Sequence, residues 1–353
     1  MKLRSVSMAA MAIALVFGGQ AFAQTGAQTG PDVDQAAINA PTVEPGYTVP
    51  RMKDGRPDLS GVWTNASNTT LRRPASNKNL VMTDAEAAEA RARNPSNIRQ
   101  ATDDNQKLSD GKLDGKDLTS GRGYNAFWID PGNNYANVKG TWRTSWIVEP
   151  ASGQVPSKPG ARTGRPAERG SGYDNPEERN LNERCIILGT SGPPIGNYLY
   201  NNNTQIFQSP DHVVILSEMI HDARIIPLNA THKSTALVPW MGDSIGWYEG
   251  DTLVVETINM TRGGSGVQLS PTGKITERFT RYSEKQVFYE FEVNDPSLYT
   301  QTWKGQMGLN ASPGLYEYAC HEGNYGLHGI LEGGRANDRS GKSNAAQGDR
   351  DDG

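Results

Sequence analysis

The feature that most constrains the fold of this chain is a series of short strand-like segments that follows Cys185. Turn residues separate these runs, and no helical pattern lies between them. The runs are Tyr198–Gln208, His212–Met219, Ala223–Leu228, Ile245–Glu249, Thr252–Met260, Lys274–Ser283, Gln286–Val293 and Leu298–Leu309. Gly250-Asp251 joins two of them, as in a tight hairpin. The sequence therefore predicts an all-β fold built as an antiparallel meander.

An up-and-down barrel and a β-sandwich both accommodate such a meander. Near the start of the folded region, Gly61-Val62-Trp63 resembles the Gly-x-Trp that opens lipocalin-type barrels. We expect an antiparallel up-and-down, lipocalin-like barrel with a small central cavity, and a β-sandwich is the alternative.

Before Cys185 the chain predicts one short helix and long loops. Thr83-Asp84-Ala85-Glu86 is a capping box before an alanine-rich segment, which indicates a surface helix near residues 84–93. The polar stretches 95–122 and 150–180 are typical of loops, one of which is a candidate lid. Two strand-like runs lie between them, at Tyr124–Ile129 and Thr144–Val148.

The ends of the chain differ from its middle. Lys2 and Arg4, an apolar run from Met8 to Phe17 and Ala21-Phe22-Ala23 predict a signal peptide over residues 1–23. Residues 24–56 and 333–353 lack apolar periodicity, which predicts a disordered linker and a disordered tail around a single domain over residues 57–332. No later stretch is long and apolar enough for a membrane span, so we expect a periplasmic or secreted protein.

The two cysteines, Cys185 and Cys320, are predicted to form a disulfide because two lone thiols tend to pair in an oxidising compartment. With 35 basic and 39 acidic residues, the chain has no basic field to hold nucleic acid. No motif for an organic cofactor is present. A metal site made from His221, His232 and His321 would need three distant loops to converge, so no metal is predicted.

Strand alternation indicates which side chains face inward. In Gln286–Val293, the residues Val287, Tyr289, Phe291 and Val293 share the apolar face. On the preceding strand, Glu277 and Arg281 share the face of Ile275 and Phe279. Burying an unpaired charge is costly, so we expect either a structural Glu277–Arg281 ion pair or a pair that binds a polar group of a ligand.

The candidates for chemistry are histidines beside carboxylates. His221-Asp222 lies two residues before Arg224 at the junction of two strands, and His321-Glu322 follows Cys320. A carboxylate that orients and tunes an imidazole makes it a general acid or base, although each histidine equally fits an ordinary loop hydrogen bond.

Two further sequence patterns fit either a functional site or an ordinary structural role. Gly242-Asp243-Ser244-Ile245-Gly246 matches the letters of a nucleophile elbow, but a hairpin follows it instead of a helix, which favours a polar turn. Trp240 and Trp247 flank this segment, and with Trp142, Trp146 and Tyr124 they are either core residues or the aromatic wall of a pocket.

Several strings resemble a family of secreted bacterial proteins of unknown function. They are Glu218–Leu228 (EMIHDARIIPL), Trp240–Thr257 (WMGDSIGWYEGDTLVVET), Glu277–Arg281 (ERFTR) and Tyr316–Leu327 (YEYACHEGNYGL), with Gly123–Asp130 and Arg143–Pro150 also similar. The resemblance covers most of residues 57–332. It implies one recurring β domain, implies no reaction, and favours a site at His221, Asp222, Arg224 and His321.

We therefore expect a periplasmic enzyme without a cofactor that acts on a small aromatic or sugar-like compound by elimination, isomerisation or hydrolysis. In this hypothesis His221, oriented by Asp222 or another carboxylate, is the base, and Arg224 or Arg281 stabilises negative charge. Trp240, Trp247, Glu277, Arg281 and Glu322 are the expected substrate-binding residues. The alternatives are a non-catalytic carrier of a small apolar ligand and a structural protein of the envelope.

Overall fold

The computed structural model describes residue 38 and residues 43–98, 131–161, 172–188, 191–233, 235–260, 264 and 266–341. Its strands are β1 (Gly61–Thr64), β2 (Val81–Met82), β3 (Asn137–Val138), β4 (Thr141–Arg143), β5 (Ile147–Glu149), β6 (Asn203–Gln208), β7 (His212–Ser217), β8 (Ala223–Pro227), β9 (Asp243–Glu249), β10 (Thr252–Ile258), β11 (Lys274–Arg281), β12 (Gln286–Asn294) and β13 (Trp303–Ala311). The helices are α2 (Asp84–Arg93) and α5 (Tyr325–Arg339), with short 3-10 turns at η3 (Pro176–Glu178) and η4 (Met219–His221).

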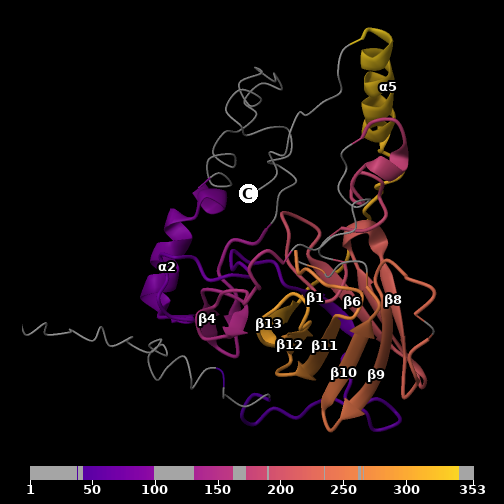
Figure 1. Cartoon of the computed structure of the whole chain (residues 1–353). Coiled ribbons are helices and arrows are strands. Elements are labelled where there is room, and N and C mark those ends of the chain that lie inside the picture. The colour runs from indigo at the N-terminus through magenta and orange to yellow at the C-terminus, as the bar shows by residue number, and fades with distance from the viewer. Residues whose placement is uncertain are drawn as a thin grey trace, which may run out of the picture.

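The fold is mostly antiparallel β, as the sequence predicts. One sheet has ten strands in the order β8-β7-β6-β1-β13-β12-β11-β10-β9, with β5 added beside β13 (Figure 1). Every ladder in it is antiparallel. All eight strand-like runs after Cys185 contain a strand, and the Gly250-Asp251 hairpin joins β9 to β10 with Gly250 at φ 59°. A left-handed residue at this turn is the conformation for which glycine is suited.

The two edge strands of this sheet, β8 and β9, meet at one place. Leu228 and Gly246 form an isolated parallel bridge, and the Asn229 amide donates to the Gly246 carbonyl at 2.7 Å. A Cβ on Gly246 would lie 3.0 Å from Cγ2 of Ile226, so the absence of a side chain permits this approach. No continuous ladder joins β8 to β9 among the described residues, and the sheet is therefore curled but not closed.

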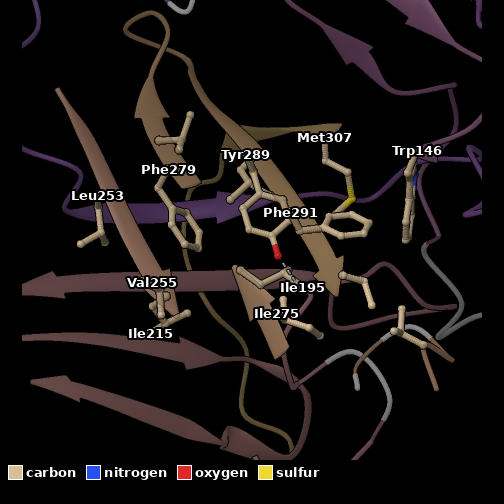
Figure 2. Packing of buried hydrophobic residues seen from close by; sticks show 14 of the residues in the cluster. Trp146, Ile195, Ile215, Leu253, Val255, Ile275, Phe279, Tyr289, Phe291 and Met307 are labelled. Carbon is tan, nitrogen blue, oxygen red and sulfur yellow. Dashed lines mark hydrogen bonds between the residues drawn. The ribbon is translucent and has the colours of Figure 1, made fainter. Parts of the chain in front are cut away.

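The concave side of the sheet carries the core. Val287, Tyr289, Phe291 and Val293 of β12 are all buried there, which confirms the predicted inner face. Phe279 packs on Tyr289 with ring centroids 4.9 Å apart, and Phe291 meets the edge of Trp303 at 5.8 Å. Figure 2 shows the rings of Phe279, Tyr289 and Phe291 among aliphatic side chains that include Ile215, Leu253 and Val255. The interior is thus occupied by side chains.

The second sheet has three strands, in the order β2-β4-β3, and lies beside α2 (Figure 1). Helix α2 confirms the predicted surface helix: Thr83 and Glu86 form the capping box, and Ala87 is its one buried residue. Among the described residues, no helix is long and apolar enough to cross a membrane.

The ends of the folded part differ from the expectation. Helix α5 continues past residue 333, where the sequence predicts a disordered tail to begin, and Gly334 packs against Tyr173. Residues 43–56 also make specific contacts: the Glu44 amide donates to Tyr282, and Arg51 pairs with Asp251 at 2.6 Å. Each segment is held by a few single contacts and not by a continuous apolar face. Such contacts produce no apolar periodicity in the sequence, so the sequence does not reveal them. The expected signal peptide and the run Tyr124–Ile129 lie outside the described residues.

Candidate functional site

A buried ion pair joins β8 to β11. Arg224 Nη1 donates to Glu277 Oε2 at 2.6 Å, and Nη2 donates to Oε1 at 3.1 Å. Both side chains are fully buried. Glu277 thus faces inward as expected, but its partner is Arg224 and not Arg281, so the predicted Glu277–Arg281 pair is wrong. Residues four apart on a strand are separated by about 13 Å, which is too far for direct contact.

Tyr289 extends this network to the end of the sheet. Its hydroxyl donates to Glu277 Oε1 at 2.7 Å. The same hydroxyl accepts from the Ile195 amide at 2.9 Å, which is the dashed line in Figure 2. Burial, together with the negative charge of Glu277, holds the pKa of Tyr289 well above its usual value. The buried segment Ser191–Ile195 is therefore fixed over the interior by a phenol that stays protonated.

The connection from β7 to β8 has unusual backbone geometry. Ile220 and His221 both adopt left-handed conformations, with φ 62° and 49°. This region is unfavourable for a β-branched residue, and such strain is found mostly where surrounding contacts enforce it for a functional reason. Here the turn places His221 at the surface while Met219 and Ile220 stay buried.

His221 is oriented by a main-chain carbonyl. Its Nδ1 lies 3.1 Å from the Tyr318 oxygen. A carbonyl only accepts, so Nδ1 carries the proton and the lone pair of the neutral ring is on Nε2. The hydrogen bond that orients His221 thus comes from a main-chain carbonyl, where the sequence predicts Asp222 or another carboxylate.

Asp222 lies on the inner side of this strand end. Arg224 and Ile226 are buried while Ala223 and Ile225 are exposed, and Asp222, which is partly buried, falls on the side of Arg224 by alternation. Its Oδ2 is buried and accepts no hydrogen bond from any described residue. Desolvation raises the pKa of Asp222 to about 6, although Ser191 and the charge of His221 act against the shift. This carboxyl therefore changes charge within the physiological pH range.

His221 lines a groove of about 360 Å³ on the outside of the sheet. The walls are the end of β7 with η4 on one side and the segment 315–322 on the other. The lining residues are Leu216, Ser217, Glu218, His221, Leu315, Tyr316, Glu317, Tyr318, Ala319 and Glu322. Of the predicted site residues, the groove brings together His221 and Glu322.

Glu218 and the disulfide hold the two walls together. Glu218 accepts from the Tyr316 amide at 2.7 Å and from the side chain and amide of Asn203 at 2.8 and 3.0 Å. The predicted Cys185–Cys320 disulfide is confirmed, and it fixes the end of the same segment. With all its oxygens engaged, Glu218 supports the groove, whereas Glu317 and Glu322 make no hydrogen bond or ion pair with the described residues.

Tyrosines, and not the expected tryptophans, border the groove. Tyr200 stacks on Tyr318 with centroids 6.3 Å apart and 14° between the planes, and Tyr198 meets the edge of Tyr200 at 5.6 Å. Burial and the neighbouring Tyr318 raise the pKa of Tyr200. The sequence signal for this row is the pair of tyrosine-rich strings at 198–200 and 316–318.

The remaining predicted site residues lie elsewhere. His321 is exposed and does not line the groove. Trp247 donates to Glu249 on its own strand, and Trp240 is 42% exposed in the loop before β9. Arg281 donates to the carbonyl oxygens of Asp58 and Glu284 and lies over the Trp63 ring. The aromatic wall is also divided, since Trp146 is in the core and Trp142 donates to Asp84 of α2.

Two other sequence patterns have structural roles. Ser244 is on a strand with its hydroxyl bonded to Thr257 at 2.8 Å, so the segment is not a nucleophile elbow. His232 is held between Asp243 at 2.9 Å and Glu256 at 3.2 Å. In the part of the chain that the structure describes, no group of three or more His, Cys, Asp or Glu side chains is arranged to hold a metal ion.

Comparison of the chain with protein-family models, with curated proteins and with solved structures finds no match. The assignment of the site consequently depends on its geometry.

Proposed function

We propose that the protein is an extracytoplasmic acid–base enzyme that acts on a small sugar-like or aromatic compound bound in the groove between η4 and the segment 315–322. The single observation that carries this proposal is the fixed orientation of His221. Its Nδ1 is engaged by Tyr318 and its ring lines a groove whose volume is in the range of small-molecule sites. A neutral imidazole held in one tautomer is suited to abstract a proton.

In the proposed reaction Nε2 of His221 accepts a proton from a C–H or O–H group of the substrate. The imidazolium that forms is stabilised by the ionised form of Asp222, which interacts electrostatically with it. Glu317 and Glu322 accept hydrogen bonds from substrate hydroxyls. The proton then returns to another atom of the same compound in an isomerisation, or to a leaving group in an elimination.

Arg224 has a positioning role in this scheme. Both of its Nη groups are occupied by Glu277, and it does not line the groove. We therefore assign it, with Tyr289, to fixing the end of β8 and the segment Ser191–Ile195, and not to stabilising charge on the substrate.

The carrier alternative has less support, because the interior in which a carrier would bind its ligand is filled by the core side chains.

Within the all-β class, the curled sheet favours a barrel over a sandwich. Its strands follow one another in chain order around the sheet, β1 lies between β6 and β13, and β8 meets β9 at Leu228 and Gly246. Closure predicts that the Asn229 amide exchanges with solvent as slowly as amides in the β10–β11 ladder.

A reaction in D₂O tests the proposed activity. Mature protein is incubated with panels of sugars, sugar acids and hydroxylated aromatic compounds, and substrate loss or deuterium incorporation at carbon is followed by NMR. We expect turnover or exchange with at least one compound, reduced at least about 100-fold in His221→Gln, which is the scale of one general base. His328→Gln is the matched control, because His328 is exposed on α5 outside the groove. Equal activity in both variants would exclude His221 as the base.

A further inference from the structure

We infer that the ligand of this groove is a saccharide of at least two rings, bound along the row of tyrosines Tyr318–Tyr200–Tyr198. This inference rests on the proposed function, in that it names the substrate class for the same site. It rests on the arrangement of the rings, on the charge of the lining and on the free carboxylates.

The rings are arranged as a row. Tyr200 and Tyr318 are nearly parallel, with 14° between their planes, and Tyr198 follows Tyr200 edge to face. A cation is instead held by several faces that converge on one point. The axial C–H groups of a pyranose carry partial positive charge and pack on the negative face of an aromatic ring. A row of aromatic side chains therefore suits an extended ligand with more than one ring better than it suits one small ammonium group.

Tyr198, at one end of the row, and Tyr316, which lines the groove, are exposed, while Tyr200 and Tyr318 are half-buried. Tyr198 is 40% and Tyr316 is 77% exposed, and the adjoining Leu199 is 43% exposed. Large apolar side chains gathered on a surface mark a place where something binds. Because Tyr198 lies outside the residues that line the groove, the row would offer a second binding position in addition to the one at His221.

The charge of the lining excludes an anionic ligand class. Three carboxylates, those of Glu218, Glu317 and Glu322, line the groove, and no lysine or arginine does so. Carboxylates are pure acceptors, so their best neutral partners are groups with several donors, such as the vicinal hydroxyls of a sugar. A benzoate-like or phosphorylated compound would be repelled by the same groups.

The affinity of defined probes tests this inference in the full mature chain carrying His221→Gln, which cannot turn them over under the proposed mechanism. The probes are glucose, cellobiose, maltose, N-acetylglucosamine and diacetylchitobiose, with 4-hydroxybenzoate and choline as the other ligand classes. Binding is followed by saturation-transfer NMR and calorimetry. We expect at least one disaccharide to bind at least tenfold more tightly than its monosaccharide, since the second ring gains the Tyr198–Tyr200 surface.

The variants distinguish the two positions. Tyr198→Ala should remove the tenfold gain and leave the monosaccharide affinity unchanged, while Tyr316→Ala should weaken both. Phe207→Ala, an aromatic residue 46% exposed on β6 outside the groove, is the control and should change neither. The inference is overturned if no saccharide binds, if the mono- and disaccharide bind equally, or if Tyr198→Ala has no effect.

Failure of the inference and failure of the proposed function give different results. If 4-hydroxybenzoate or another single-ring compound is turned over in a His221-dependent way and no saccharide binds, the substrate class is wrong and the enzyme proposal stands. If a disaccharide binds as expected but wild-type protein never alters it, the site is a saccharide site and the acid–base proposal fails.

Discussion

Arg224 on β8 and Glu277 on β11 form a two-point ion pair, with Nη1–Oε2 at 2.6 Å and Nη2–Oε1 at 3.1 Å. The two strands are far apart in the order of the sheet, so this contact spans its concave interior. The pair therefore holds the curl of the sheet and fixes the strand end that carries His221 and Asp222.

Removing one partner of this pair should destabilise the fold much more than removing both partners. Arg224→Met leaves the Glu277 charge buried without its partner, which is expected to lower the free energy of unfolding by about 3–5 kcal/mol in a urea titration. Arg224→Met combined with Glu277→Leu should recover most of that loss. The control is Arg278→Ala, which breaks the exposed pair with Glu249 and should cost less than about 1 kcal/mol. Equal stability of Arg224→Met and the wild type would contradict this role.

Replacing Asp222 by asparagine should stabilise the folded protein, and the size of this gain should depend on pH. Its pKa in the folded protein, about 6, is above the usual value of 3.8, so the folded state binds this proton more tightly than the unfolded state does. The stabilisation that follows is complete below about pH 4 and is lost as the pH rises through about 6. Asp222→Asn should therefore match the wild type at pH 4 and exceed its stability at pH 7.5 by about 1 kcal/mol, allowing for solvent screening.

Thermal unfolding at the two pH values measures this effect. Glu284→Gln removes an exposed carboxylate and serves as the control, with no pH-dependent gain expected. An Asp222→Asn variant that is less stable than the wild type at pH 7.5 would show that the ionised carboxylate has a favourable partner in the fold.

The disulfide should stabilise both the fold and the groove. Cys185 and Cys320 are 135 residues apart, and opening a loop of this size is expected to cost up to about 5 kcal/mol. We expect Cys185→Ser/Cys320→Ser to unfold at lower urea concentration and to bind the probes of the groove more weakly. Dithiothreitol should bring the wild type to the midpoint of the variant and leave the variant unchanged. If the midpoints of wild type and variant coincide without reductant, the disulfide has no stabilising role.

The fold was largely predictable because its determinants are local. Alternation in β12, the hairpin at Gly250-Asp251 and the capping box at Thr83 each depend on a few adjacent residues, and the structure contains all three. The sequence does not predict helix α5, because Gly326, Gly329, Gly333 and Gly334 lower its helix propensity and only Leu331 and Gly334 are buried in it.

The site was only partly predictable because its contacts join distant segments. The sequence indicated His221, Asp222 and Glu277, yet the partner of Glu277 is 53 residues away and the partner of His221 is a carbonyl 97 residues away. A carbonyl carries no sequence signature. The tyrosine row likewise forms only when residues 198–200 meet residues 316–318, which the path of the chain decides.

The measurement that tests the central claim most directly is NMR of the histidine rings in ¹⁵N-labelled protein, with His221→Gln to assign the signals. We predict that the neutral ring of His221 carries its proton on Nδ1, and that a bound saccharide probe shifts its Nε2 resonance while His212 and His328 stay unchanged. A proton on Nε2, or a probe that binds without moving the His221 signals, would contradict the assignment of His221 as the base of this groove.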